Sequence, residues 1–503
     1  MERWRISMIG DLPQTLKNKE AIICGGEKVT YAELIENQKH LEDRLKYMLK
    51  DVKKKKIAFI MENGIDFIQF FLAVCHAGGI AVPLDPKWKE EQYKTVLLDA
   101  EPDLVIVHDE FKQKIPESAS VNLHTWKQLF SDDALPRHGN PSSASPERDD
   151  LFYLGYTSGT TGRPKGFMRN HQSWSECFPY CSEIFQLKRE DHILSPGALV
   201  HSHFLFAAMH ALHTGATLYL CESFDTEEVF DIIERFPVSV MYIVPTMFES
   251  LFANKQEEFY RMNRILSSGA KWDKTSKNKV RSLFPNADIL EFYGASELSF
   301  VSYLLDSDHK AKGHTIGRPF PKVQAKIIKE DGSEASQGEV GLLSVKSPWV
   351  FKGYLNLPEE SRKVIHNGWA TVGDLAFMDE DGYYTIVGRK HNMIISGGLN
   401  IYPEEVENVI VHLSEIKEAV VIGLPDFYWG EKVIAVVSLK EGSTLNEGQV
   451  FNYCKAFLPN YKCPKQLVVV EEFPYTSSGK IGRSELKDKL IYVHSKERMK
   501  TYE

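Results

Sequence analysis

Cysteine is scarce and scattered in this sequence: seven residues occur among 503, and no paired CxxC motif is present. An odd number at irregular spacing argues against a disulfide scaffold, so we expect a reduced compartment in which most cysteines are small core residues. The sequence also lacks the run of about 18 apolar residues that a membrane helix needs, and its first residues lack the apolar run of a signal peptide. We therefore expect a soluble, cytoplasmic protein without a membrane span.

An excess of positive charge is also missing. Sixty Lys and Arg residues against 69 Asp and Glu residues give a formal net charge of -9. Binding to a nucleic-acid backbone needs a basic surface, so we expect no dedicated nucleic-acid binder. The 43% of hydrophobic and 26% of charged residues are typical of globular proteins, and the length allows several domains of about 150 residues.

Helix-like and strand-like segments alternate along the first third of the chain. Leucines at helical spacing follow Thr30, and Glu33 completes the pattern of a capping box, which predicts the start of a helix. Apolar runs at 57–61 and 80–84 predict buried strands between such helices. This alternation indicates parallel α/β layers.

The character of the sequence changes from about Gly313, where glycines and short alternating strands predict a small β-rich subdomain. After Gly388 an α+β pattern follows, with a predicted helix at 403–412 and a predicted strand at 419–422. We therefore predict an α/β protein. Its large N-terminal domain, residues 1–390, combines layered α/β subdomains with the small β-rich subdomain, and its C-terminal α+β domain spans 391–503.

The segment 155–166, GYTSGTTGRPKG, follows a predicted strand and is rich in glycine, hydroxyl groups and cations. Glycines allow close approach of backbone N–H groups to a ligand, and hydroxyls and Lys165 can bind phosphate oxygens. The segment lacks the spacing of a Walker loop. Composition alone leaves a flexible surface turn open, but Lys165 and Gly166 at its end favour phosphate binding.

Residues 157–166 (TSGTTGRPKG) resemble the signature loop of the AMP-forming adenylating enzymes, which include the acyl-CoA synthetases. Other segments match motifs of that family in the expected order. They are YGASE at 293–297, with Ser296 where Thr is usual, WATVGD at 369–374, GRK at 388–390, SGGLNIYP at 396–403 and GK at 479–480. The resemblance covers about residues 30–483 and implies the same fold, with a C-terminal domain that is mobile.

The resemblance also implies roles for individual residues. Lys480 would be the catalytic lysine of adenylation, and Glu297 would take part in catalysis by holding Mg²⁺. Asn392, where the family usually has Asp or Lys, would be the hinge of the C-terminal domain. The remaining assignments are Thr157, Ser158, Gly159, Thr160, Thr161, Gly162, Lys165 and Ser296 for the phosphates of ATP, Gly269, Ala270, Tyr293, Gly294, Asp374 and Arg389 for adenine and ribose, and Gly397 and Gly398 for the turn beside the thiol of CoA.

Several of these residues also have a structural interpretation. Most lysines are solvated surface groups, an Asp beside a glycine often caps a turn, and a tyrosine after a strand is more often part of the core. Asn392 can equally be an ordinary loop residue. The assignments for Lys480, Asp374 and Tyr293 therefore depend on the resemblance.

A pocket for the acyl group is predicted from 196–215 and 299–304, which are apolar and carry small residues. The family places a His or an aromatic gate here, and the spacing after Pro196 leaves both His201 and His203 as candidates. No aspartate for an α-amino group is evident in the pocket segment, which argues against amino-acid activation. We therefore predict an aliphatic, fatty carboxylic acid as substrate.

The predicted reaction is ATP-dependent formation of an acyl-adenylate, with release of pyrophosphate, followed by transfer of the acyl group to CoA. Mg²⁺ is the expected cofactor, and ATP and CoA are the expected co-substrates. Two alternatives remain: activation of an aryl or other acid with transfer to the phosphopantetheine of a separate acyl carrier protein, and a non-catalytic nucleotide-binding homologue. The sequence leaves the oligomeric state open, including a homodimer.

Overall fold

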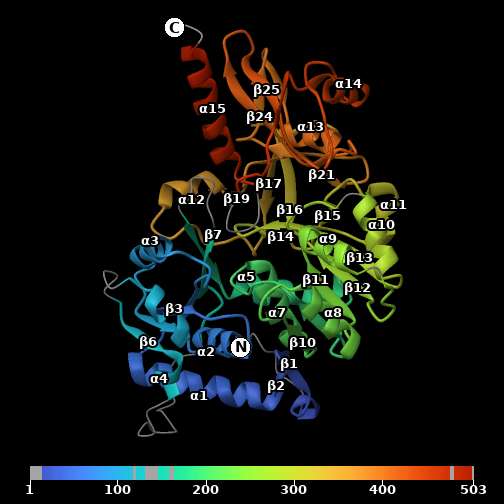
Figure 1. Cartoon of the computed structure of the whole chain (residues 1–503). Coiled ribbons are helices and arrows are strands. Elements are labelled where there is room, and N and C mark those ends of the chain that lie inside the picture. The colour runs from blue at the N-terminus through green and yellow to red at the C-terminus, as the bar shows by residue number, and fades with distance from the viewer. Residues whose placement is uncertain are drawn as a thin grey trace. The chain divides into compact units, whose positions relative to one another are not determined.

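The computed structural model describes residues 14–116, 121–130, 146–157, 164–255, 257–272, 274–475 and 481–500. The chain forms two compact units (Figure 1). The larger unit comprises the described residues up to Thr157, together with Pro164–Ala325 and Val345–Val372. The smaller unit comprises Lys326–Ser344 and the described residues from Gly373 onwards. The predicted α/β fold with a large N-terminal and a smaller C-terminal part is confirmed.

One sheet of the larger unit has six strands in the order β6-β5-β3-β4-β7-β8. Its strands pair in parallel except for the last, β8, which runs antiparallel to β7. The strands are β3 (Lys56–Ile60), β4 (Ile80–Pro83), β5 (Leu104–Val107), β6 (Leu123–Thr125), β7 (Leu151–Thr157) and β8 (Lys165–Asn170), and the intervening helices are α2 (Ile65–His76), α3 (Glu90–Ala100), η2 (Asp109–Lys114) and α4 (Trp126–Phe130). These alternating helices and parallel strands confirm the pattern predicted for this part of the chain.

The second sheet of the larger unit has nine strands in the order β15-β14-β13-β12-β11-β9-β10-β1-β2. Its strands are β1 (Glu20–Cys24), β2 (Glu27–Thr30), β9 (His192–Ser195), β10 (Thr217–Leu220), β11 (Val240–Ile243), β12 (Arg264–Ser267), β13 (Asp288–Ala295), β14 (Ser299–Leu304) and β15 (Arg318–Pro319). The strands from β1 to β13 along this order are joined in parallel, and β2, β14 and β15 are attached in antiparallel fashion.

In the sequence, helices lie before and between the strands of this sheet. They are η1 (Gln14–Leu16), α1 (Tyr31–Leu49), α5 (Gln172–Ser175), α6 (Cys177–Ile184), α7 (Ser202–Thr214), α8 (Thr226–Arg235), α9 (Pro245–Asn254), α10 (Lys274–Leu283), η4 (Asp306–Asp308) and α11 (His309–Lys312). Helix α1 begins with the predicted capping box, in which Thr30 and Glu33 exchange hydrogen bonds. The cap satisfies backbone N–H groups that the first turn of a helix would otherwise leave without partners.

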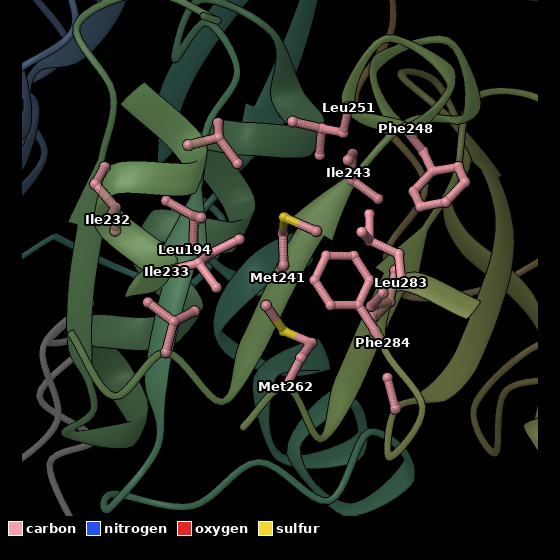
Figure 2. Close-up of a cluster of buried hydrophobic side chains, with 14 of the residues drawn as sticks. Leu194, Ile232, Ile233, Met241, Ile243, Phe248, Leu251, Met262, Leu283 and Phe284 are labelled. Carbon is pink, nitrogen blue, oxygen red and sulfur yellow. The ribbon is translucent and has the colours of Figure 1, made fainter. Parts of the chain in front are cut away.

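A hydrophobic cluster fixes helices α8, α9 and α10 on the nine-stranded sheet (Figure 2). Leu194, Met241 and Ile243 on the strands lie among Ile233, Phe248 and Phe284, and all six side chains are buried. Burial of such side chains stabilises the fold by roughly 1.5–3 kcal/mol each. The cluster holds β12 and β13 in place, and these strands end at residues of the predicted site.

The segment with short strands contributes to both units. In the larger unit, α12 (Pro358–Val364) is followed by a hairpin of β18 (Ile365–His366) and β19 (Trp369–Ala370). In the smaller unit, β20 (Asp374–Met378) pairs antiparallel with β21 (Tyr384–Arg389). The remaining strands of this segment are β16 (Gln324–Ile328) and β17 (Gly341–Lys346).

The rest of the smaller unit is built on a long hairpin of β24 (Ile416–Asp426) and β25 (Gly430–Leu439). Strands β22 (Ile394–Ser396), β23 (Leu399–Ile401) and β26 (Gln466–Val469) extend the sheet. The helices are α13 (Pro403–Ile410), α14 (Glu447–Phe457) and α15 (Arg483–Lys500). The inward side chains of β24 and β25 alternate between two hydrophobic clusters, so the sheet has a core on each face.

Two further predictions from composition can be compared with the structure. All seven cysteines are buried and none forms a disulfide, as expected for small core residues. Among the described residues, no helix is both long and apolar enough to span a membrane.

Candidate active site

Lys165 lies at the start of β8, directly opposite Thr157 at the end of β7. The two residues therefore flank the glycine-rich loop, whose residues Ser158, Gly159, Thr160, Thr161 and Gly162 lie outside the described part of the chain. The Lys165 ammonium lies 2.9 Å from the Glu360 carboxylate and 5.5 Å from the centre of the Tyr354 ring. The predicted phosphate-binding cation thus has an acidic and an aromatic neighbour.

Glu360, in helix α12, is a neighbour that the sequence reasoning did not find. Hydrogen bonds from Lys363 and then from Lys165 lower the pKa of the Glu360 carboxyl to about 2, so it is ionised at neutral pH. In the sequence, an acidic residue in the first turn of a helix indicates only a favourable interaction with the helix dipole. Its contact with Lys165, 195 residues away, is a property of the tertiary structure.

Ser296 and Glu297 occupy the turn between β13 and β14. Close packing begins just before this turn, because a Cβ atom on Gly294 would lie 2.1 Å from the carbonyl oxygen of Ser299. No side chain fits there, so glycine is required for the turn to close. The predicted Mg²⁺-binding carboxylate therefore lies in a tight turn at the end of β13.

The Glu297 carboxylate accepts a hydrogen bond of 2.7 Å from the Tyr354 hydroxyl. Burial, and then the charge of Glu297, raises the pKa of Tyr354 well above its ordinary value, so the phenol keeps its proton and remains a donor. Because the same ring lies beside the Lys165 ammonium, Tyr354 connects the predicted phosphate and metal positions. The sequence reasoning did not identify Tyr354.

Backbone hydrogen bonds place Tyr354 there. The amide of Leu355 donates to the carbonyl of Gly166, and the amide of Met168 donates to the carbonyl of Gly353. The segment 351–355 therefore runs alongside β8, which begins with Lys165. A sequence signal for this pairing is weak, since the segment contains no regular alternation of apolar and polar residues.

The residues predicted to hold adenine lie at the carboxyl ends of two neighbouring parallel strands. Ser267 of β12 is paired with Glu291 of β13, and Gly269 and Tyr293 each lie two residues beyond this pair. Gly269 has a φ of +89°, and Ala270 next to it is exposed. Ligands of open α/β sheets bind at such strand ends, so this placement is compatible with the prediction.

In the smaller unit, Asp374 and Arg389 lie opposite each other on β20 and β21. The Arg389 Nε atom donates to the Asp374 carboxylate at 3.0 Å, and Asp374 is only 4% exposed. The pair predicted to contact the ribose therefore forms from two adjacent strands.

Asn392 follows in a tight turn, where its backbone N–H donates to the carbonyl of Arg389 at 3.0 Å. Its side-chain amide donates to the Glu404 carboxylate at 2.7 Å. Asn392 is therefore anchored to helix α13 in this conformation. The catalytic candidate Lys480 lies outside the described residues.

Gly397 and Gly398 form the two-residue turn between β22 and β23. Their φ angles of +59° and +78° lie in the left-handed region, as in hairpin turns of the type that favours glycine. The Gly397 N–H donates to the carbonyl of Trp429 at 2.7 Å, which fixes one side of the turn. Gly398 is exposed, and a Cβ atom built on it would meet no atom within 4 Å, so a ligand can approach the backbone there.

The two histidines of the predicted acyl pocket have different surroundings. His201 precedes helix α7 and is exposed. His203 stacks on Phe292 with 5.5 Å between ring centres and lies edge-on to Phe204 at 4.7 Å. Burial lowers the pKa of His203 to about 4, so its ring is neutral at physiological pH. Which of them faces the acyl group stays a prediction.

The site offers few ligands to a metal ion. Among the described residues, no group of three or more His, Cys, Asp or Glu side chains could hold one. Glu297, the predicted metal ligand, supplies hard carboxylate oxygens. A single carboxylate fits Mg²⁺, which usually keeps several waters and binds through one or two carboxylates and the phosphates of the substrate.

Comparison with protein families identifies two matching regions. Residues 12–355 match the family of AMP-binding enzymes, and residues 405–480 match the C-terminal domain of AMP-binding enzymes. Together the matches include Lys165, Glu297 and Tyr354 in the first region and Lys480 in the second.

Relatives and a solved structure agree with these matches. The chain is 38% identical over 440 residues to an uncharacterized acyl–CoA ligase, YhfT, of Bacillus subtilis, covering 86% of this chain and 87% of that protein. It is 30% identical to a long-chain-fatty-acid–CoA ligase of the same organism, over 95% of this chain and 93% of that protein. O-succinylbenzoate CoA synthetase (MenE) from Bacillus subtilis, solved with the acyl-adenylate OSB-AMP, superposes with a TM-score of 0.85 at 27% identity, over 93% of this chain and 95% of that one. The same synthetase has also been solved with ATP and a magnesium ion.

Proposed function

We propose that this chain, which belongs to the family of AMP-binding enzymes, activates a carboxylic acid with ATP and transfers the acyl group to CoA. The observation that carries the proposal is the grouping of Lys165, Tyr354 and Glu297. A cation and a carboxylate, joined by one neutral phenol, are what a site for the metal-bound phosphates of ATP requires.

The first step of the proposed reaction is adenylation. A carboxylate oxygen of the acid forms a bond to the α-phosphorus of ATP, the bond to the bridging oxygen breaks, and pyrophosphate leaves. Two anions must approach each other, so positive charge has to be supplied. We assign this role to Lys165 on the pyrophosphate side and to Lys480 at the reacting carboxylate, and we assign Glu297 to Mg²⁺, which neutralises phosphate charge when bound.

The second step of the proposed reaction is thioester formation. The thiol of CoA gives up its proton to water, its sulfur forms a bond to the acyl carbon, the bond to the AMP oxygen breaks, and AMP leaves. We assign the bare turn at Gly397 and Gly398 to the pantetheine arm, because only glycines allow its close approach to the backbone. Asp374 and Arg389 are assigned to the ribose of AMP in both steps.

For the acid we propose a fatty acid. One support is the apolar character of α7, in which the residues from Phe204 to Leu212 are all buried. The other is the similarity to a long-chain-fatty-acid–CoA ligase. A specific observation also favours a second candidate, an aryl acid. Phe206 and Phe300 lie with ring centres 4.5 Å apart, and His203 stacks on Phe292, so aromatic rings from α7, β13 and β14 meet in the predicted pocket region. Such rings suit a planar substrate as well as an alkyl chain.

Pyrophosphate release over a panel of acids tests the proposal. We expect release with medium- and long-chain fatty acids, background release with amino acids, and acyl-CoA only when CoA is added. Release with benzoate-type acids alone would select the aryl candidate. Absence of release with every acid, from a protein that still binds ATP, would favour a non-catalytic homologue.

The acceptor needs a separate experiment. Free CoA and a holo acyl carrier protein are compared as acceptors after the acyl-adenylate has formed. Thioester formation with CoA supports the proposal. Thioester formation with the carrier protein but not with CoA would show that the carrier protein is the acceptor.

A further inference from the structure

Arg169 is a buried arginine in the middle of β8. It is only 1% exposed, and its guanidinium donates to two main-chain oxygens, the carbonyl of Trp349 at 2.8 Å and the carbonyl of Ser296 at 2.6 Å. Both of these partners are uncharged, and among the described residues no carboxylate forms an ion pair with it. Burial lowers the pKa of Arg169 to about 10, so the group is still charged at neutral pH.

A charged group in such a place is costly, because its desolvation is compensated by two carbonyl dipoles and by the charge of Glu297 but by no ion pair. An apolar residue would fill the same volume without this cost. We therefore look for a role of Arg169 in its hydrogen bonds rather than in its packing. They connect three segments that are far apart in the sequence, 169, 296 and 349.

The strand that carries Arg169 also carries Lys165. Side chains four residues apart in a strand point to the same face, at a spacing of about 13 Å. Thus β8 presents the predicted phosphate cation at its start and the buried guanidinium further along the same face. Any movement of the Ser296–Glu297 turn relative to β8 would strain the bond to Arg169.

The turn itself is held at two successive carbonyls. Arg169 binds the carbonyl of Ser296, and the amide of Phe351 donates to the carbonyl of Glu297 at 2.8 Å. The second hydrogen bond of Arg169, to Trp349, ties down the start of the segment that contains Phe351 and Tyr354. Tyr354 then holds the Glu297 carboxylate itself.

We propose that Arg169 is a positioning residue for Glu297. Its planar guanidinium sets the separation between the Ser296–Glu297 turn and the segment 349–354, and so holds the Glu297 carboxylate where it meets the Mg²⁺ of bound ATP. A guanidinium can do this because its N–H groups diverge in a rigid plane, whereas the three N–H groups of a lysine share one nitrogen on a flexible stem. This inference rests on the proposed function, in which Glu297 binds the metal.

The test compares nucleotide binding with and without Mg²⁺ in the whole chain. The affinity of a fluorescent ATP analogue is measured in excess Mg²⁺ and in EDTA, for the wild type, Arg169→Lys and Arg169→Gln. In the wild type we expect Mg²⁺ to strengthen binding. In both variants we expect most of this increase to be lost, by roughly tenfold or more, as for other residues that orient a metal ligand, while affinity in EDTA stays within about twofold.

A matched control separates positioning from general destabilisation. Ile265→Val shortens a buried side chain in β12, away from the turn, and lowers stability modestly. In Ile265→Val, Mg²⁺ should strengthen nucleotide binding as much as in the wild type, even if the melting temperature falls as far as in Arg169→Lys. The proposal is overturned if Arg169→Lys folds and Mg²⁺ still strengthens its nucleotide binding as much as in the wild type.

A measurement on the unmodified chain covers the case in which the variants do not fold. With arginine side chains labelled with ¹⁵N, the Arg169 guanidinium signals should be protected from exchange and should shift on addition of ATP with Mg²⁺, but not of ATP with EDTA. Guanidinium signals that do not shift when Mg²⁺ is present with ATP overturn the inference. A wild type that shows neither an effect of Mg²⁺ nor pyrophosphate release instead contradicts the proposed function itself.

Discussion

The ammonium of Lys165 and the carboxylate of Glu360 form an ion pair of 2.9 Å within the larger unit. Lys165 is the first residue of β8, at the end of the predicted phosphate loop, and Glu360 lies in α12. The pair therefore joins this loop to a helix residue that lies 195 positions later in the sequence. The lysine is thus held at a defined position next to Tyr354, and in the proposed function it exchanges its carboxylate partner for a phosphate oxygen.

Lys165→Ala should weaken the use of ATP far more than it weakens the fold. A charge-assisted hydrogen bond is worth about 1.5–3 kcal/mol, so we expect the KM for ATP to rise roughly 10- to 100-fold. Its partly exposed ion pair with Glu360 should contribute only about 0–1 kcal/mol to stability. Steady-state kinetics and thermal melting check the two effects. A variant with unchanged ATP dependence would show that Lys165 merely ends a surface turn.

Tyr354→Phe removes the hydroxyl that holds Glu297 and leaves the ring in place. We expect the rate of pyrophosphate release to fall about tenfold, because a misplaced carboxylate holds Mg²⁺ less well. The free energy of unfolding should fall by about 1–2 kcal/mol for one lost buried hydrogen bond. Tyr31→Phe is the matched control, since its hydroxyl donates to Ala216 at 2.6 Å in the same unit but away from the site. Equal losses of rate in the two variants would speak against a role for Tyr354.

The two half-reactions should separate in variants of the smaller unit. Lys480→Ala should slow adenylation by roughly 10²–10³ but still form thioester from supplied acyl-adenylate. Asn392→Pro should retain pyrophosphate exchange and lose thioester formation, because proline fixes φ near −65° and prevents the hinge from switching.

Asn392→Ala is the control for the hinge. It loses the hydrogen bond to Glu404 but retains the backbone N–H that donates to Arg389, which proline would remove. We expect this variant to carry out both half-reactions. Pyrophosphate exchange, acyl-CoA formation and melting are measured on all three proteins, and a parallel loss of both half-reactions in folded Asn392→Pro would contradict the hinge assignment.

Stability of the larger unit should fall in mild acid. Burial lowers the pKa of His171 to about 4 and that of His210 to about 3, below the ordinary value of 6.5. Between about pH 6.5 and pH 4 the unfolded chain therefore binds protons that the folded chain does not, so stability is lost as the pH falls. The free energy of unfolding should change by about 1.4 kcal/mol per pH unit for each such histidine.

A substitution identifies the contribution of one histidine. His171→Phe keeps a ring beside Phe152 but cannot be protonated, so the dependence of unfolding free energy on pH should become flatter by about 1.4 kcal/mol per unit. His366→Gln, at an exposed position, should leave the slope unchanged. Urea unfolding at pH 7 and pH 5 provides the measurement.

Local features were predictable from the sequence because short-range physics decides them. The capping box at Thr30 and Glu33 depends on residues three positions apart, and the left-handed φ angles of the turn at Gly397 and Gly398 are those that glycine adopts most readily. The helix predicted at 403–412 is present as Pro403–Ile410. The strand predicted at 419–422 is longer, Ile416–Asp426, because pairing with β25 extends it beyond its most apolar residues.

The order of the motifs likewise determined the family of this chain, together with the fold and the adenylation chemistry expected of it. The contacts around Glu297 could not be predicted in this way. Tyr354, Glu360 and Arg169 carry no local pattern, and each meets its partner across more than 50 residues of chain. Only the pairing of β8 with the segment 351–355, and its closure on the turn after β13, brings them together. Such contacts depend on the packing of several elements at once, so the tertiary structure alone decided them.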